Sequence, residues 1–142
     1  MTALVTTPVR RLRREVPSRL RAVEAVCREV RALLREHGLE AAIFAVELSA
    51  RECLNNAVLH GNRGQATRRV ALEMWIGRIW IRLQVTDQGK GFNWRQARIE
   101  ATREGSPHGR GLAICALYAY RVAFNRRGNR ITLWLAKPKT DH

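Results

Sequence analysis

Hydrophobic positions recur at helical spacing over two neighbouring stretches of the chain. Between Ser18 and Gly38 they return every three or four residues, which predicts an amphipathic helix with Ser18 as its N-cap and Gly38 at its C-terminal end. A second helix is predicted from about Ala41 to His60, and the sequence Gly61-Asn62-Arg63-Gly64 indicates the turn that ends it. Two adjacent helices are therefore expected in the first half of the chain.

Alternating hydrophobic and polar residues predict strands elsewhere. The alternation begins near Arg68 and continues through a turn at Gly77-Arg78 into a return strand. A third helical run, from Leu112 to Tyr120, precedes a final hairpin. The predicted strands cover residues 10–17, 68–76, 79–86, 121–125 and 131–136. We therefore expect an α+β fold, a two-layer sandwich in which helices cover one face of a mixed and mainly antiparallel sheet.

The second predicted helix has two polar faces. Glu47 and Arg51 are expected to form a pair that faces solvent. The other face is an arc of four polar residues, Ser49, Glu52, Asn56 and His60. Because hydrophobic residues flank this arc, its polar groups need partners, which are either a bound ligand or a buried hydrogen-bond network.

Asp87 is a further polar residue on a face that the pattern predicts to be buried. It follows the strand that contains Val85 and is in phase with the hydrophobic residues of that strand. A buried carboxylate is unfavourable unless it accepts hydrogen bonds, so Asp87 either binds a ligand or caps the turn that follows it. The sequence is consistent with both alternatives.

Two glycine-containing segments follow, at residues 87–92 and 108–114. Glycine lets backbone N–H groups converge on an anion or lets a flat ring approach the chain, and a helix N-terminus favours phosphate. Neither segment matches the phosphate-binding loop of nucleoside triphosphatases or the dinucleotide-binding fingerprint. The polar segment from Asn93 to Pro107 between them is a candidate cover over a ligand.

The bulk composition is that of one strongly basic domain. The chain has 142 residues, which predicts a single domain at 1–142 with its core at about 18–137. Its 26 lysines and arginines against 12 aspartates and glutamates give a net charge of +14. Because the arginines are spread along the chain and no nucleic-acid-binding motif is recognised, the charge favours an acidic partner or an anionic ligand over direct nucleic-acid binding.

Cysteine use and hydropathy indicate the compartment. Cys27, Cys53 and Cys115 lie in apolar helical contexts without a Cys-x-x-Cys pair, as expected of buried thiols in a reducing environment. No apolar run approaches the roughly 20 residues of a transmembrane helix. We expect a cytoplasmic protein without a membrane partner.

Three motifs occur in a fixed order along the chain. They are Glu-x-x-x-Asn at Glu52–Asn56, Asp-x-Gly-x-Gly at Asp87–Gly91 and Gly-x-Gly-Leu at Gly109–Leu112. This order resembles the ATP-binding fold shared by gyrase, histidine-kinase and MutL-like proteins. The length of the chain and the sequence from Glu52 to Asn62 look most like the small anti-sigma-factor serine kinases of bacterial partner-switching systems.

The resemblance implies roles for individual residues. Glu52 matches the residue that takes the proton from the attacking hydroxyl. Asn56, favoured over its neighbour Asn55 by its spacing from Glu52, matches the residue that coordinates Mg²⁺. Asp87 matches the residue that accepts a hydrogen bond from the exocyclic amine of adenine. The resemblance places the base and phosphate contacts at Gly89, Gly91, Gly109, Arg110, Gly111 and Leu112.

The resemblance also implies a function and partners. These kinases bind a sigma factor and use ATP and Mg²⁺ to phosphorylate a serine on a small antagonist protein, and a homodimer is implied as well. One alternative is an ATP-gated module that sequesters a regulator without phosphorylating anything. Another is a basic nucleic-acid-binding domain, which a strongly salt-dependent DNA affinity independent of ATP would favour.

Overall fold

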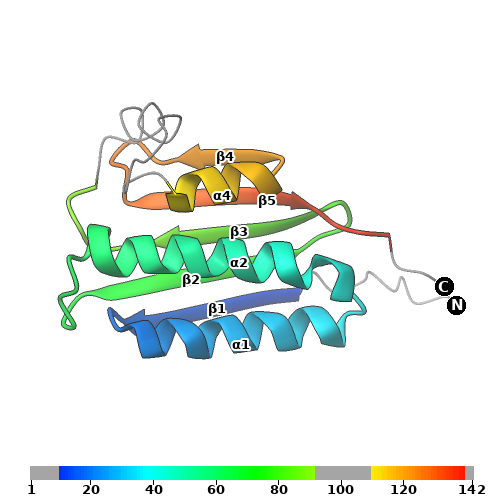
Figure 1. Ribbon diagram of the computed structural model, residues 1–142, viewed down its shortest axis with the longest axis horizontal. Helices are drawn as coiled ribbons and strands as arrows, with labels where there is room; N and C mark the ends of the chain where they lie inside the picture. Colours follow the sequence, from blue (N-terminus) through cyan, green and yellow to red (C-terminus); the bar gives the residue numbers. More distant parts are fainter. Residues whose placement is uncertain (1–9, 92–109, 140–142) are drawn as a thin grey trace, which may run out of the picture.

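The computed structural model describes residues 10–91 and 110–139, with the backbone alone for 110–112. Its described part has two layers, a five-stranded sheet and a layer of helices that covers one face of it (Figure 1). The order of strands in the sheet is β1-β2-β3-β5-β4. The strands are β1 (Arg10–Pro17), β2 (Arg69–Ile76), β3 (Trp80–Thr86), β4 (Arg121–Phe124) and β5 (Arg130–Ala136). The helices are α1 (Leu20–Glu36), α2 (Glu40–Asn56), the short π-helix η1 (Ala57–Gly61) and α4 (Arg110–Tyr118).

The predicted fold class is confirmed, and all four strand pairings of the described sheet are antiparallel. The strands form where the sequence alternates, because one face of each strand packs under the helices. The second hairpin strand begins at Trp80 instead of Ile79, whose side chain is 68% exposed in the turn. The buried strand residues are Leu12, Val70, Leu72, Met74, Ile76, Ile81, Leu83, Val85, Leu133 and Leu135.

Helix α1 begins one residue later than predicted, and Ser18 is not its N-cap. The N-cap position is Arg19, without a side-chain hydrogen bond. The hydroxyl of Ser18 is buried and donates instead to the carbonyl oxygen of Arg68, 2.7 Å away. The helix ends as predicted before Gly38, whose φ of +70° is the left-handed conformation that favours glycine after a helix.

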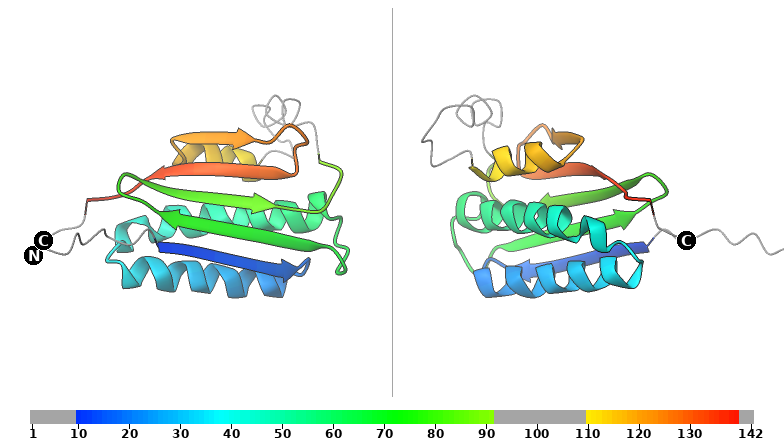
Figure 2. Two further views of the ribbon diagram at one scale, coloured as in Figure 1. Left: turned by 180° about the vertical axis from the view of Figure 1, so that it is seen from behind. Right: turned by 45° about the vertical axis from the view of Figure 1, so that its right-hand side comes forward.

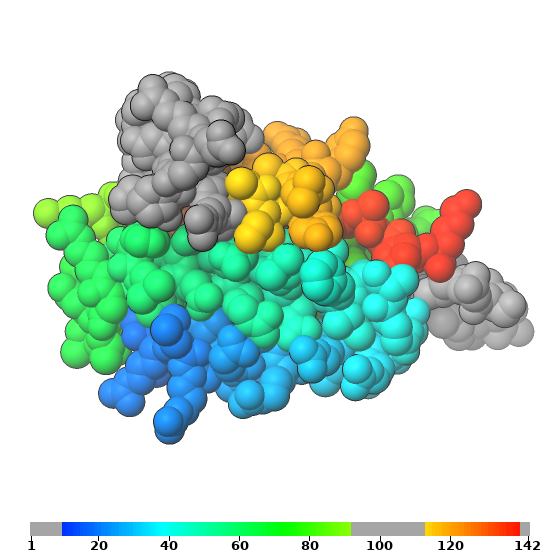
Figure 3. Space-filling model, viewed as in Figure 1, coloured from blue at the N-terminus to red at the C-terminus, as the bar shows by residue number. Residues whose placement is uncertain are grey.

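The helices lie side by side over the sheet, and α4 packs along α2 (Figure 3). The run predicted at 112–120 is shifted, since α4 ends at Tyr118 and the backbone N–H of Tyr120 already donates to Trp134 of the sheet. The three cysteines are buried, as expected from the sequence. Within the described residues, no helix has the length and hydrophobicity needed to cross a membrane.

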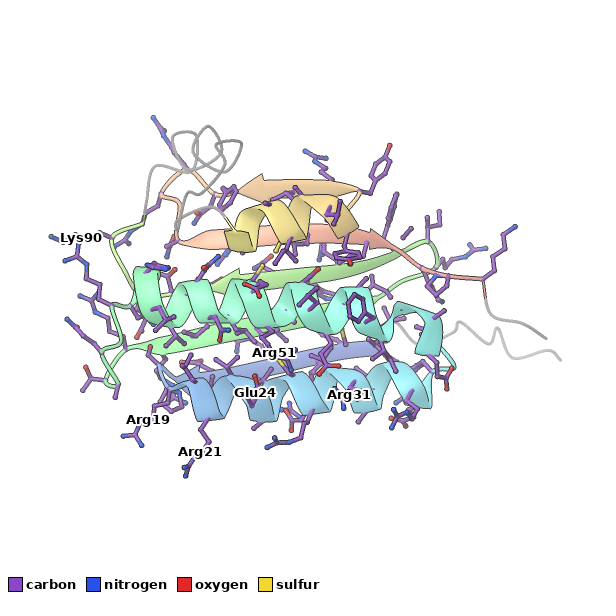
Figure 4. The ribbon with its side chains drawn as sticks, viewed as in Figure 1. Arg19, Arg21, Glu24, Arg31, Arg51 and Lys90 are labelled. Carbon is purple, nitrogen blue, oxygen red and sulfur yellow. The ribbon has the colours of Figure 1, made fainter. Side chains whose placement is uncertain are left out.

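The predicted solvent-facing position of Glu47 is wrong. Its carboxylate is buried between α1 and α2, where it accepts hydrogen bonds from Arg31 at 2.6 and 2.8 Å and from Arg51 at 3.1 Å. Arg51 also binds Glu24 of α1 (Figure 4). The hydrogen bond from Arg31, followed by that from Arg51, holds the pKa of Glu47 below its usual value of 4.5 despite burial. The helices are therefore joined by an ion-pair cluster that spacing within one helix does not reveal.

Glu47→Gln should lower the free energy of unfolding by about 1–3 kcal/mol at pH 7, because it removes the negative charge and one of the two oxygens that Arg31 and Arg51 bind. The pKa of Glu47 is lower in the native than in the unfolded state, so its contribution is present above the unfolded value near 4.5 and is lost as pH falls through the folded value. Urea unfolding measures this effect. The difference in the free energy of unfolding between Glu47→Gln and the unmutated protein should shrink below about pH 4.5.

The matched control is Glu29→Gln. It removes a half-exposed carboxylate that lies 2.7 Å from Arg14, and exposed pairs of this kind contribute less than about 1 kcal/mol. Equal losses in the two variants would contradict the special role of the Glu47 cluster.

Candidate functional site

Two of the predicted site residues project from the C-terminal half of α2. Glu52 and Asn56 are one helical turn apart, so their side chains lie on the same face of the helix. Both are partly exposed, and neither has a hydrogen-bond or ion-pair partner in the part of the chain that the structure describes. A carboxylate and an amide that point the same way without partners are available to a ligand.

Ser49, the first residue of the predicted polar arc, differs from this pair because it is buried. Ser49 is fully buried, and its hydroxyl oxygen has no hydrogen-bond partner among the residues that the structure describes. The sulfur of Cys115 in α4 lies 3.9 Å from the carbonyl oxygen of Ser49 and 3.4 Å from the sulfur of Cys53. The four residues of the arc therefore do not form one continuous ligand face, since Ser49 is buried whereas Glu52 and Asn56 are partly exposed.

The C-terminal end of α2 changes from an α-helix to a π-helix. In η1, the backbone N–H of Asn62 donates to the carbonyl oxygen of Ala57 at 2.7 Å, five residues earlier. His60 lies within this wider turn and is exposed. Arg63 and Gly64, with φ of 53° and 68°, then reverse the chain.

Asn62 connects this turn to three other segments. Its side-chain nitrogen donates to the hydroxyl of Ser18 at 2.8 Å and to the carbonyl oxygen of Arg69 at 2.9 Å. Its side-chain oxygen accepts from the backbone N–H of Gln88 at 2.8 Å. Asn62 is fully buried, and sequence reasoning assigned it only to a turn, because its partners are 7 to 44 residues away.

Asp87 is buried in phase with β3, as predicted. One carboxylate oxygen accepts a hydrogen bond from the backbone N–H of Gly89 at 2.8 Å, so the turn-capping alternative holds for that oxygen. The other oxygen has no hydrogen-bond donor among the described residues. Burial raises the pKa of Asp87, an effect that the Gly89 N–H opposes. The second oxygen remains able to accept a hydrogen bond from a ligand.

Two glycines allow the π-helix η1, which follows α2, to contact Asp87. A Cβ on Gly61 would overlap the carboxylate of Asp87, and a Cβ on Gly89 would overlap the carbonyl of Gly61. This close approach puts the end of β3 directly against the π-turn, and the two ends lie together in Figure 1. Gly61 is a site residue that the sequence motifs did not identify.

The turn between β4 and β5 supports the Asp87 loop from the other side. Asn129 accepts from the backbone N–H of Asp87 through its carbonyl oxygen and donates from its side chain to the carbonyl oxygen of Asp87, both at 2.9 Å. A Cβ on Gly91, which has a φ of +84°, would overlap the carbonyl of Arg127. The predicted Gly89 and Gly91 positions thus require glycine for close backbone packing.

The last predicted motif lies at the start of α4. Gly109 is outside the described residues, as is the candidate cover at Asn93–Pro107, while Arg110, Gly111 and Leu112 form the first turn of the helix. Helices α2 and α4 are antiparallel, with Cys53 against Cys115 and the ring centroids of Phe44 and Tyr118 5.9 Å apart. The N-terminus of α4 therefore lies beside the end of α2 that carries Asn56.

These groups combine at one end of the molecule. A buried carboxylate with an available oxygen, an unpaired acid and amide, and a helix N-terminus can together bind a base, a metal ion and phosphates. No group of three His, Cys, Asp or Glu side chains in the described ranges could hold a metal by itself. A cation at Asn56 would therefore need oxygen ligands from the bound molecule.

Gly61→Ala should lower the free energy of unfolding by about 1–3 kcal/mol, because the added methyl group displaces the Asp87 carboxylate. Gly77→Ala is the control, since its Cβ would lie 3.3 Å from the carbonyl oxygen of Trp80 in an exposed hairpin turn, and it should cost less than about 1 kcal/mol. Thermal or urea unfolding measures both. A Gly61→Ala protein as stable as the unmutated one would show that Asp87 does not pack against Gly61.

Comparison with known proteins agrees with this geometry. A family model described as a histidine kinase-like ATPase domain matches residues 16–137, which include α2, the Asp87 loop and α4. No curated protein matches the chain at a significant level. The family match spans most of the chain and includes every described residue of the candidate site. The chain therefore belongs to the family of histidine kinase-like ATPase domains.

Proposed function

We propose that the protein is an anti-sigma factor and serine-protein kinase. It sequesters a sigma factor or similar regulator, and it uses Mg²⁺ and ATP to phosphorylate a serine on a small antagonist protein. The observation that supports this most strongly is the pair Glu52 and Asn56, which share a helix face beside the Asp87 loop and lack protein partners among the described residues. An ATPase-family site that offers an unpaired acid next to a metal-binding amide suits phosphoryl transfer.

In this proposal Asp87 reads the adenine base. Its available carboxylate oxygen accepts a hydrogen bond from the exocyclic amine, and the base lies beside the turn that contains Gly89 and Gly91. The Gly89 N–H and the packing of Gly61 fix the carboxylate before the nucleotide arrives. Little ordering of this loop is then needed on binding.

Glu52 and Asn56 act at the phosphate end. The carbonyl oxygen of Asn56 is a suitable ligand for Mg²⁺, which neutralises charge on the phosphates. Glu52 takes the proton of the substrate serine while the serine oxygen attacks the terminal phosphorus and ADP leaves. In this proposal the backbone N–H groups at Arg110 and Gly111, in the first turn of α4, bind phosphate oxygens.

The alternative is an ATP-gated module that binds a regulator without phosphorylating it. It uses the same Asp87 and Asn56 contacts and needs no proton acceptor at Glu52. The two functions are separated by incubating the protein with a candidate antagonist, ATP and Mg²⁺ and searching for phosphoserine by mass spectrometry.

Asp87→Asn should weaken ATP and ADP binding by more than about 1.4 kcal/mol, or tenfold, measured by calorimetry. The fold should survive, because an asparagine oxygen can still accept from the N–H of Gly89. Burial raises the pKa of Asp87, so its stabilising contribution is lost as pH rises through the folded-state pKa. The variant should therefore be at least as stable as the unmutated protein at pH 7. Unchanged ADP affinity would remove Asp87 from the site.

Glu52→Gln and Asn56→Ala should have different effects. Glu52→Gln should leave nucleotide affinity nearly intact and slow phosphate transfer by about 10²- to 10⁴-fold, the usual contribution of a general base. Asn56→Ala should weaken binding of Mg·ATP, with a smaller loss for nucleotide measured without metal. Single-turnover transfer and nucleotide titration measure both on the same protein.

Asn55→Ala is the matched control for Asn56→Ala, because Asn55 is the adjacent, partly buried residue on a different helix face. It should leave the metal dependence of nucleotide binding unchanged. Transfer at the unmutated rate in Glu52→Gln would eliminate the catalytic role and favour the ATP-gated module.

A further inference from the structure

Arginine and tryptophan alternate across the five described strands, on the face of the sheet opposite the described helices. Residue pairing in the sheet places Arg11 beside Trp75, Trp75 beside Arg82, Arg82 beside Trp134, and Trp134 beside Arg121. We call these five residues the Arg–Trp ladder. The view from behind shows the five strands of this face in front of the helices (Figure 2, left).

The ladder holds its guanidinium groups in place through the tryptophan rings. The guanidinium carbon of Arg82 lies 4.0 Å from the ring centroid of Trp75, and that of Arg11 lies 5.3 Å from the same ring. The guanidinium carbon of Arg121 lies 5.1 Å from the ring centroid of Trp134. These cation–π contacts restrict the conformations of the arginine side chains before a partner binds. Less side-chain entropy is then lost on binding.

Two arginines of the ladder lack an acidic partner. Arg82 and Arg121 have no ion pair with any described residue, and the Nε of Arg82 is buried without a hydrogen-bond acceptor. Arg11, by contrast, binds Glu73 at 2.6 Å. The charges of Arg82 and Arg121 are therefore not balanced by any described carboxylate, and an acidic partner can supply the missing counter-charge.

The surrounding sheet face is also basic. Its outward-facing strand positions carry three times as many arginines as carboxylates, and both carboxylates are paired with arginine. The arginines are Arg11, Arg13, Arg69, Arg82, Arg121 and Arg130, and the carboxylates are Glu15 and Glu73. Such a face repels a second copy of itself, so a homodimer through it is disfavoured and an acidic partner is favoured.

We propose that the Arg–Trp ladder docks an acidic protein segment that also carries apolar side chains. Carboxylates bind the outer edges of the guanidinium groups, and apolar side chains pack on the exposed parts of the tryptophans. Tryptophan and arginine are the residues that contribute most to binding at protein interfaces. This docking does not depend on kinase activity. Only the suggestion that the docked segment belongs to the sequestered regulator rests on the proposed function.

The geometry favours a protein over a single-stranded nucleic acid. Base stacking needs open ring faces, whereas arginines from the neighbouring strands flank Trp75 on both sides. Carboxylates can bind the guanidinium edges without breaking these contacts. The ladder also lies on the opposite face of the sheet from α2, so a docked segment leaves Glu52 and Asn56 accessible.

The test measures the binding of two fluorescein-labelled peptides by anisotropy. One has five repeats of Glu-Glu-Leu and the other has five repeats of Glu-Glu-Gln, which carries the same charge without the apolar residues. The Glu-Glu-Leu peptide should bind at least about tenfold more tightly and should change the tryptophan fluorescence of the unmutated protein. Its affinity should fall as salt rises.

The double variant Arg82→Gln with Arg121→Gln should weaken the Glu-Glu-Leu peptide by at least about tenfold. The control is Arg21→Gln with Arg35→Gln, which removes the same charge from exposed positions on α1 and should change the affinity less than about threefold. ATP affinity, measured in parallel, should be unchanged in both double variants. A protein without kinase activity can still show these peptide affinities. The docking proposal and the proposed kinase function can therefore be disproved independently.

Several results would overturn the proposal. Equal losses in the two double variants would assign binding to diffuse charge, and equal affinity for the two peptides would eliminate the role of the tryptophans. A thymidine oligonucleotide of 15 residues that binds more tightly than either peptide would assign the face to nucleic acid. If peptide binding does not change the tryptophan fluorescence of the unmutated protein, the peptide binds away from the Arg–Trp ladder. This measurement decides the question even if the double variant Arg82→Gln with Arg121→Gln does not fold.

Discussion

The arrangement of the site depends on the buried side chain of Asn62. Three hydrogen bonds from one amide group join the π-turn after α2 to the Ser18 junction, to the start of β2 and to the loop after β3. Without Asn62, the carbonyl oxygen of Arg69 and the backbone N–H of Gln88 would lose these part-buried partners, at a cost of about 1–3 kcal/mol apiece. Asn62 thereby fixes the distance between the helix that carries Glu52 and Asn56 and the loop that carries Asp87.

The two faces of the sheet have separate roles in this account. In the proposed function the nucleotide binds at the helix-covered face, where the contact between Cys53 and Cys115 links α2, which carries Glu52, to α4. The open face carries the Arg–Trp ladder and most of the sheet's unbalanced charge. A protein that binds a nucleotide and a partner together needs such a separation, because the two ligands then do not compete for the same surface.

The sequence predicted what depends on local spacing. The strands, the burial of Asp87 and the common face of Glu52 and Asn56 follow from periods of two and 3.6 residues. The predictions for Ser18, Glu47 and Ser49 failed because their surroundings come from Arg68, from Arg31 and from Cys115, which are distant in sequence or lie on another helix. The ladder was missed for a related reason, since it exists only in the strand register.

The central claim is that Asp87 reads adenine through its exocyclic amine. The most direct measurement compares the affinities of the unmutated protein for ATP and for inosine triphosphate, which carries a carbonyl oxygen in place of that amine. ATP should bind at least about tenfold more tightly, because the carbonyl would face a buried carboxylate as a second acceptor. Equal affinities for the two nucleotides would contradict the assignment of Asp87 and the nucleotide orientation built on it.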